Sequence, residues 1–147
     1  MKKILISACL IGDKVRYDGG HNKSLLIDQL LEKYELVPFC PEVEGGLSVP
    51  REVAERKGKD KVITIKGRDV TRNYLEAAQK AYLICSYLGI EMAILKEGSP
   101  ACGVHEIYDG TFTHKKIKGK GFVAEYLSKK GIKIISEDEI ENLLKEE

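Results

Sequence analysis

Short apolar segments alternate with longer amphipathic ones along this chain, and that order constrains the fold more than any other sequence feature. Apolar runs of four to seven residues are typical of buried strands, and spacings of three and four residues are typical of helices. The pattern predicts strands at 2–7, 35–39, 62–65, 90–96 and 133–136, helices at 23–34, 71–88, 121–130 and 137–145, and long loops at 9–22, 43–61 and 97–120.

Strands that alternate with helices predict a mostly parallel sheet covered on both faces. We therefore expect a three-layer, Rossmann-like or flavodoxin-like α/β fold, with residues 1–147 as a single domain. Two boundaries carry local signals. Asp69 or Thr71 is suited to cap the long helix, which Gly89 should end, and Ser136 with Glu139 forms a capping box for the last helix.

Composition narrows the functional classes. Hydrophobic residues make up 43 % and charged residues 32 %, with a formal net charge of +1. These values are typical of a soluble globular protein, and they disfavour a binder of duplex nucleic acid. The apolar start, residues 4–12, is too short for a membrane span and lacks a cleavage site. The sequence predicts a cytoplasmic protein without a membrane partner.

Three of the four cysteines fall just after predicted strands. Cys9 lies two residues past the first strand, Cys40 follows the second directly, and Cys102 lies in the loop after the strand at 90–96. Because ligands bind at the carboxyl edge of a parallel sheet, we expect these thiols to converge there. Cys85 lies inside a predicted helix and is expected to be a buried thiol.

Converging thiols have more than one use. They could ligate zinc or an iron–sulfur cluster, or one could be a nucleophile and another its resolving thiol. They could also be unrelated loop residues. Structural disulfides are not expected in the cytoplasm, there is no CxxC motif, and the separations of 31 and 62 residues match no compact ligand motif.

The residues beside these cysteines add chemical groups. Glu42 lies two residues after Cys40 and could be a general acid or base. Ser99 lies three residues before Cys102 and could donate a hydrogen bond to a ligand. The alternative for Glu42 is a solvated loop carboxylate, and the alternative for Ser99 is a turn residue before Pro100.

Five separated motifs resemble one known family. They are SACLIG with RYDGGH, PFCPEVEGGL with PR, GRDVT, AILKEGSPACG and IYDGTF. In this order they resemble the domain-of-unknown-function 523 family, whose characterised members are thiouracil desulfurases, also called desulfidases (TudS). The resemblance implies an α/β fold and a 4Fe-4S cluster on Cys9, Cys40 and Cys102, with one iron left open. It also makes Glu42 the catalytic carboxylate and Ser99 a catalytic residue, while Ala101 departs from the serine expected in many relatives.

The implied reaction is non-redox removal of sulfur from 2-thiouracil, 4-thiouracil or 4-thio-UMP. The open iron would act as a Lewis acid on the thiocarbonyl sulfur, and Glu42 would accept a proton from the attacking water. Two Tyr-Asp-Gly segments could hold the ring, or they could be only turns, since Asp-Gly is a strong turn signal. Basic residues could hold a phosphate, or they could be only solvated. The candidate substrate-binding residues are Arg16, Tyr17, Asp18, His21, Arg51, Lys96, Tyr108 and Asp109.

Three alternatives remain open from the sequence. A sulfurtransferase with a persulfide on Cys40 or Cys102 would need no iron. A cluster carrier or redox sensor would hold iron without turnover. A relative that acts on thiolated tRNA is disfavoured by the near-zero net charge and the lack of a second domain. A free base or nucleotide is therefore the expected partner.

Overall fold

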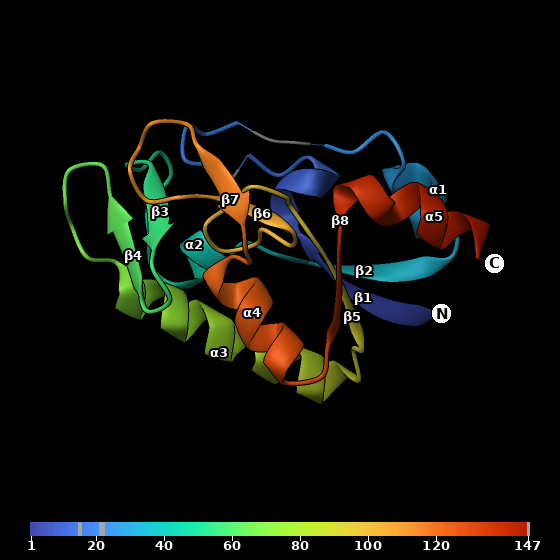
Figure 1. Ribbon diagram of the computed structural model, residues 1–147. Coiled ribbons are helices and arrows are strands. Elements are labelled where there is room, and N and C mark those ends of the chain that lie inside the picture. The colour runs from blue at the N-terminus through green and yellow to red at the C-terminus, as the bar shows by residue number, and fades with distance from the viewer. Residues whose placement is uncertain (15, 21–22, 147) are drawn as a thin grey trace.

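A parallel four-stranded sheet forms the centre of the computed structural model, which describes residues 1–14, 16–20 and 23–146 (Figure 1). Its strands run in the order β2-β1-β5-β8, and every neighbouring pair is parallel. Their bounds are β1 Lys2–Ser7, β2 Tyr34–Phe39, β5 Met92–Leu95 and β8 Lys133–Ser136. The predicted parallel sheet is confirmed.

Helices cover both faces of this sheet. Helices α3 (Thr71–Leu88) and α4 (Phe122–Lys129) lie on one face, and α1 (Ile27–Leu31) and α5 (Ile140–Lys145) lie on the other (Figure 1). Successive side chains of β1 alternate between the two, because Leu5 packs with the α3 cluster while Ile4 and Ile6 pack with the α1 and α5 cluster. This is the three-layer α/β fold expected from the sequence.

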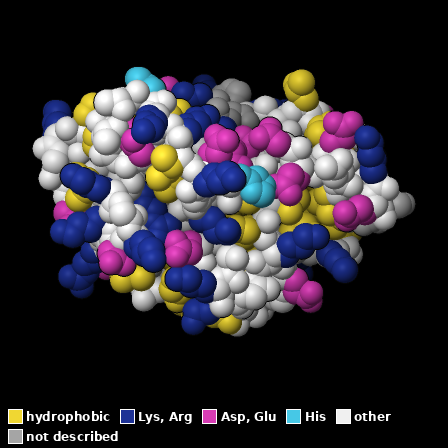
Figure 2. Space-filling view, in the orientation of Figure 1, with side chains coloured by type: hydrophobic (Ala, Val, Ile, Leu, Met, Phe, Trp, Pro, Cys, Tyr) yellow, Lys and Arg dark blue, Asp and Glu magenta, His cyan; other side chains and the backbone are white. Residues whose placement is uncertain are grey.

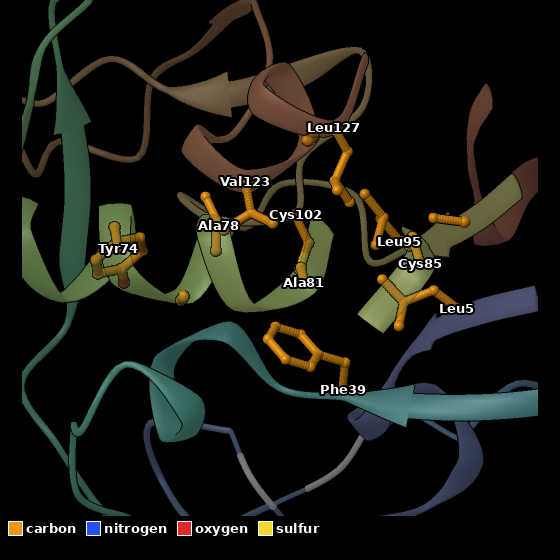
Figure 3. Close-up of a cluster of buried hydrophobic side chains, with 14 of the residues drawn as sticks. Leu5, Phe39, Tyr74, Ala78, Ala81, Cys85, Leu95, Cys102, Val123 and Leu127 are labelled. Atoms are coloured by element: carbon orange, nitrogen blue, oxygen red, sulfur yellow. The ribbon is translucent and has the colours of Figure 1, made fainter. Parts of the chain in front are cut away.

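Helix α3 packs closely on the sheet because its buried side is made of small residues. Ala77, Ala78, Ala81 and Cys85 are each 0 % exposed, and Figure 3 shows this side facing Leu5, Phe39 and Cys102. The helix ends at Gly89, whose φ of 70° is left-handed, as predicted. The expectation that Cys85 is a buried thiol is also confirmed. No described helix combines the length and the apolar character that crossing a membrane requires.

The first helix is shorter than the predicted range of 23–34. The N–H of Ser24 donates to the carbonyl of Leu10 at 2.8 Å, and its hydroxyl accepts from the N–H of Leu26 at 3.2 Å. Residue 24 therefore belongs to a turn tied to the first loop, and Tyr34 already pairs with Lys2 in the sheet. The residues at the two ends of the predicted helix therefore lie outside α1, Ser24 in a turn and Tyr34 in β2.

Two of the three long predicted loops, 43–61 and 97–120, contain strands that the sequence analysis missed. The first contains α2 (Pro41–Glu44) and β3 (Ala54–Lys57), which pairs antiparallel with β4 (Lys61–Thr64). The second contains an antiparallel hairpin of β6 (Glu106–Tyr108) and β7 (Lys116–Lys118). Two 3-10 helices, η1 (Ala8–Ile11) and η2 (Glu137–Glu139), complete the described elements.

Strand β3 was missed because its buried residues are charged. Arg56 is 7 % exposed and pairs with Glu125 at 2.6 Å, and its guanidinium also donates to the carbonyls of Lys59 and Lys120. Glu55 is 6 % exposed and accepts the N–H groups of Gly110 and Phe112. Buried charges are stable only with such partners, which an apolar pattern does not reveal.

The start of the last helical segment confirms the predicted capping box of Ser136 and Glu139, although its first turn is the 3-10 helix η2. Glu139 also contacts His105 at 2.6 Å. This hydrogen bond raises the pKa of His105 above 6.5. Partial burial acts to raise the pKa of Glu139. The hydrogen bonds from His105 and the Ser136 N–H outweigh it and hold this pKa below 4.5.

We expect the pair to stabilise the fold in a window of mildly acidic pH. As pH falls through the lowered pKa of Glu139, the carboxylate loses its charge and the stabilisation is lost. As pH rises through the raised pKa of His105, the imidazolium loses its charge and the stabilisation is lost again. His105→Gln should therefore lower the free energy of unfolding most near pH 6, by at most about 1 kcal/mol for so exposed a pair. Urea unfolding of both proteins from pH 5 to pH 9 tests this. A difference that grows toward pH 9 would contradict it.

Candidate active site

A cavity of about 410 Å³ lies at the carboxyl edge of the parallel sheet. The ends of β1 and β2 contribute Ser7 and Phe39, and the chain just after β5 contributes Lys96. On the other side it is closed by residues next to and within the hairpins, including Ala54 and Tyr108. Small-molecule sites usually occupy roughly 300–1,000 Å³, so the cavity has the size of a binding site.

Three thiols line this one cavity. Cys9 lies on η1, Cys40 directly precedes α2, and Cys102 lies in the loop that follows β5. Their predicted convergence is confirmed, and Cys85 remains apart in the core. All four cysteines are free thiols.

The spacing of these thiols bears on the kind of metal they could hold. Within residues 1–14, 16–20 and 23–146, no three Cys, His, Asp or Glu side chains come close enough to bind a single metal ion. Thiolates around a multi-iron cluster lie farther apart than those around one ion. Three thiols are also a donor set that soft metals accept, either as zinc or as an iron–sulfur cluster.

Two of these thiols, those of Cys40 and Cys102, are hard to ionise by themselves in the cavity. Burial raises the pKa of Cys102 well above its usual value, the charge of Glu42 adds to this, and a hydrogen bond with Ser7 opposes it. Burial and Glu42 likewise raise the pKa of Cys40 to about 11. A bound cationic group would instead stabilise the thiolates. Three sulfur donors around one cavity, two of them with raised pKa values, are a suitable set for an iron–sulfur cluster.

Glu42 also lies at the cavity wall, and it is not a freely solvated carboxylate. Its Oε1 lies 3.9 Å from the Cys40 sulfur, and its Oε2 accepts a hydrogen bond of 3.0 Å from the Tyr74 hydroxyl. Burial, followed by the charge of Glu42, raises the pKa of Tyr74 well above its usual value, so the phenol stays a donor. A carboxylate beside a thiol ligand set can exchange protons with a bound molecule.

Close packing of α2 on α3 fixes the position of Glu42. A Cβ on Gly45 would lie only 2.3 Å from the Asn73 carbonyl oxygen, so only glycine allows this approach. The Asn73 amide in turn donates to the Gly45 carbonyl at 2.8 Å. The Gly45 of the CPEVEGG segment therefore serves the contact between helices.

Ser99 organises the loop that carries Cys102. Its hydroxyl oxygen accepts the N–H groups of Ala101 and Cys102 at 3.1 and 3.0 Å. Gly121 lets the start of α4 approach the same loop, since a Cβ there would lie 2.4 Å from the Ala101 carbonyl carbon. Glu97 holds the far end of the loop by accepting the N–H groups of residues 104–106. Ser99 thus has a structural role, and it also lines the cavity.

The substrate-binding candidates divide into two groups. Arg16, Tyr17, Arg51, Lys96 and Tyr108 line the cavity. Asp18 and Asp109 do not, because each closes its own turn by accepting an N–H, from Gly20 and from Thr111 respectively. His21 lies outside the described residues. The two Tyr-Asp-Gly segments therefore bring their tyrosines to the cavity, and their aspartates stay in the turns.

Most cations of the cavity already have a carboxylate partner or a carbonyl acceptor. Arg16 pairs with Asp18 at 2.9 Å, and Lys96 pairs with Glu137 at 2.9 Å. Arg51 donates to the Ser48 carbonyl at 3.2 Å. Lys116 differs, because its ammonium lies 5.6 Å from the centre of the Tyr108 ring and makes no ion pair with a described residue.

Sequence reasoning missed two of these residues. Tyr74 sits in the first turn of α3, five residues after Asp69 of the GRDVT motif, but one buried tyrosine in a helix gives no functional signal. Lys116 is one of several lysines between residues 115 and 120, and only its pairing with Tyr108 across the hairpin brings it to the cavity.

The protein has a parallel α/β sheet with three thiols and a carboxylate beside one cavity at its carboxyl edge, an arrangement that could hold a thiolate-ligated group next to a small molecule. The chain belongs to the 2-thiouracil desulfurase family, whose model matches residues 4–139. This confirms the resemblance seen in the sequence motifs.

Two relatives cover nearly all of the chain. A solved structure described as the 4Fe-4S-dependent thiouracil desulfidase TudS is 43 % identical with a TM-score of 0.92, over 97 % of this chain and 95 % of its own. The protein YbbK of Bacillus subtilis (strain 168), described as uncharacterized, is 41 % identical over 96 % of this chain and 99 % of its own length.

Proposed function

We propose that this protein is a 4Fe-4S-dependent desulfurase that converts a small thiolated pyrimidine to its oxygen form. The observation that carries the proposal is the meeting of Cys9, Cys40, Cys102 and Glu42 in one cavity. Family membership and the likeness to a thiouracil desulfidase support the same activity.

The three cavity cysteines are the proposed ligands of the cluster, so that one iron has no protein ligand. The donor set supports this, since all three are thiols, they face one cavity, and Cys85 is separated from them in the core. When bound, the cluster supplies a Lewis acid that attracts a soft thiocarbonyl sulfur.

The protein side of the reaction is hydrolytic in this proposal. Water adds its oxygen to the carbon that carries sulfur, Glu42 accepts the proton, and the C–S bond breaks. The products are the pyrimidine carbonyl and hydrogen sulfide, so no net electron transfer is needed. Ser99 keeps Cys102 in place through its two hydrogen bonds, and Tyr17 and Tyr108 provide aromatic faces for the ring.

A nucleotide substrate is favoured over a free base by the charge around the cavity. The hairpin segments 54–68 and 105–120 together contain ten Lys and Arg against four Asp and Glu, whereas the rest of the chain contains fourteen against nineteen. Figure 2 shows Lys and Arg gathered over the side of the molecule where these hairpins lie. The net charge of +1 conceals this separation. A phosphate at the mouth of the cavity would meet Lys116 on β7.

We expect Lys116→Gln to raise the KM for 4-thio-UMP about ten-fold and to leave the KM for 2-thiouracil unchanged. One charge-assisted hydrogen bond to a phosphate has about this effect. Lys118→Gln is the matched control, since Lys118 lies on the same strand outside the cavity. Steady-state kinetics with both substrates measure the difference. Equal changes for the base and the nucleotide would exclude a phosphate contact.

Residues 1–147 form one desulfidase domain in this proposal, since both core clusters share the same sheet. Four free thiols support a reducing compartment such as the cytoplasm. The proposed partner is a thiopyrimidine base or nucleotide. Duplex nucleic acid, tRNA and membranes are not proposed partners.

Anaerobic purification followed by a desulfuration assay tests the proposed function. We expect iron and acid-labile sulfide in the protein, and one sulfide released for each uracil or UMP formed from 2-thiouracil, 4-thiouracil or 4-thio-UMP. Sulfur transfer to a thiol acceptor by iron-free protein would instead indicate the persulfide sulfurtransferase. A loaded cluster without turnover on any of these substrates would indicate a carrier or sensor.

A further inference from the structure

Tyr74 occupies an unusual place for a buried polar group. It lies in the first turn of α3, is 2 % exposed, and lines the cavity beside Glu42. Figure 3 shows it on α3, farther toward the start of the helix than Ala78 and Ala81. Its hydroxyl donates to Glu42 Oε2 at 3.0 Å. A buried hydroxyl needs such a partner, so this contact is a fixed part of the folded structure.

The contact gives the two oxygens of Glu42 different surroundings. Oε2 is held by Tyr74, whereas Oε1 lies 3.9 Å from the sulfur of Cys40. A thiolate that ligates iron has no proton to donate, so with a cluster bound Oε1 would lose this donor and Oε2 would keep Tyr74. The oxygen without a protein donor is the better proton acceptor for a bound water.

Two neighbouring residues of α3 hold the short helix α2, one through its backbone and one through a side chain. The Asn73 amide donates to the Gly45 carbonyl at the end of α2, and the Tyr74 hydroxyl donates to the Glu42 side chain near its start. The first contact fixes the backbone and the second fixes the side chain. Without the second, the carboxylate could change rotamer although α2 stayed in place.

We propose that Tyr74 is a positioning residue that holds the Glu42 carboxylate so that Oε1 faces the reacting water. This proposal rests on the proposed role of Glu42 as the proton acceptor. Tyr74 acts through Glu42 and does not itself exchange a proton with the substrate. Loss of its hydroxyl should therefore slow the chemical step and leave substrate binding unchanged.

Tyr74→Phe is the test variant, because it removes the hydroxyl and keeps the buried ring. We expect unchanged iron content, a KM within about two-fold of the wild type, and a kcat about ten-fold lower, the effect of one hydrogen bond to a charged group. Tyr82→Phe is the matched control, since Tyr82 is on the same helix but packs against Tyr126, outside the cavity. A kcat of Tyr74→Phe within two-fold of the wild type would overturn the proposal.

A double-mutant cycle with Glu42→Ala separates positioning from a general structural effect. If Tyr74 acts through Glu42, Tyr74→Phe should lower kcat by less than two-fold once Glu42 is gone. The same ten-fold loss in both backgrounds would mean that Tyr74 acts by another route and would overturn the proposal.

The same four proteins, freed of iron, give a readout that does not depend on activity. We expect the unfolding equilibria in urea to show a coupling of about five- to ten-fold between the two positions, because the hydrogen bond exists in the chain itself. Additive effects would overturn the proposal. A wild-type enzyme without turnover would count against the proposed function, and this coupling would then still decide whether Tyr74 holds Glu42.

Discussion

The variants Cys9→Ser, Cys40→Ser and Cys102→Ser are expected to lose iron, labile sulfide and desulfuration together. Each thiol lines the same cavity, and no described residue there offers another sulfur donor. A metal Lewis acid contributes several kcal/mol to a reaction of this kind. Loss of the cluster should therefore slow turnover by on the order of a thousand-fold or more. Iron and sulfide determination on anaerobically purified proteins, followed by the assay, measures both losses.

Cys85→Ala is the matched control for these three variants. Cys85 is 0 % exposed within α3 and packs in the core, apart from the cavity. We expect this variant to keep its cluster and turnover and to lose about 1 kcal/mol of stability, as for a small core deletion. A cysteine variant of the cavity that kept full iron and turnover would remove that residue from the ligand set.

Glu42→Gln is expected to lower kcat by about 10²- to 10⁴-fold while the iron content stays that of the wild type. Glutamine keeps the shape of the side chain, and its amide oxygen can still accept from Tyr74, but it cannot take a proton from water. The expected result is thus a folded, loaded and nearly inactive enzyme. Single-turnover kinetics with excess enzyme would place the defect in the chemical step.

Glu44→Gln controls for the loss of one negative charge from α2. Glu44 lies on the same four-residue helix, but it is exposed and outside the cavity. We expect kcat and KM of this variant to match the wild type. If Glu42→Gln retained full turnover with a full cluster, the proton acceptor would have to be another group.

The sequence was sufficient to predict the central sheet and the meeting of the thiols. Apolar strands alternate with helices, and this order fixes which loop ends share an edge. Cys9, Cys40 and Cys102 could therefore be placed together without any local motif. The end of α3 at Gly89 and the capping box that starts at Ser136 were also predictable, because each depends on residues close together in the chain.

The missed features depend on contacts between distant residues. Strand β3 is buried through Arg56 and Glu55, whose partners lie at residues 110–125, so no apolar pattern marks it. The role of Tyr74 requires α3, which starts 27 residues after the end of α2, to pack beside Glu42. For Asp18 and Asp109 the sequence left open a turn or a contact with the ring, and in the structure each accepts an N–H within its own turn.

The three cavity cysteines follow three adjacent strands, in the spatial order β2, β1 and β5. As cluster ligands these thiols would have no local affinity for metal, since the chain segments meet only when the strands have paired. In zinc fingers, by contrast, metal binding itself drives folding. Here core residues such as Ile6, Leu30 and Ala77 are each 0 % exposed and lie outside the cavity. We therefore expect the strands to pair first and the cluster to be assembled on a chain that has already folded.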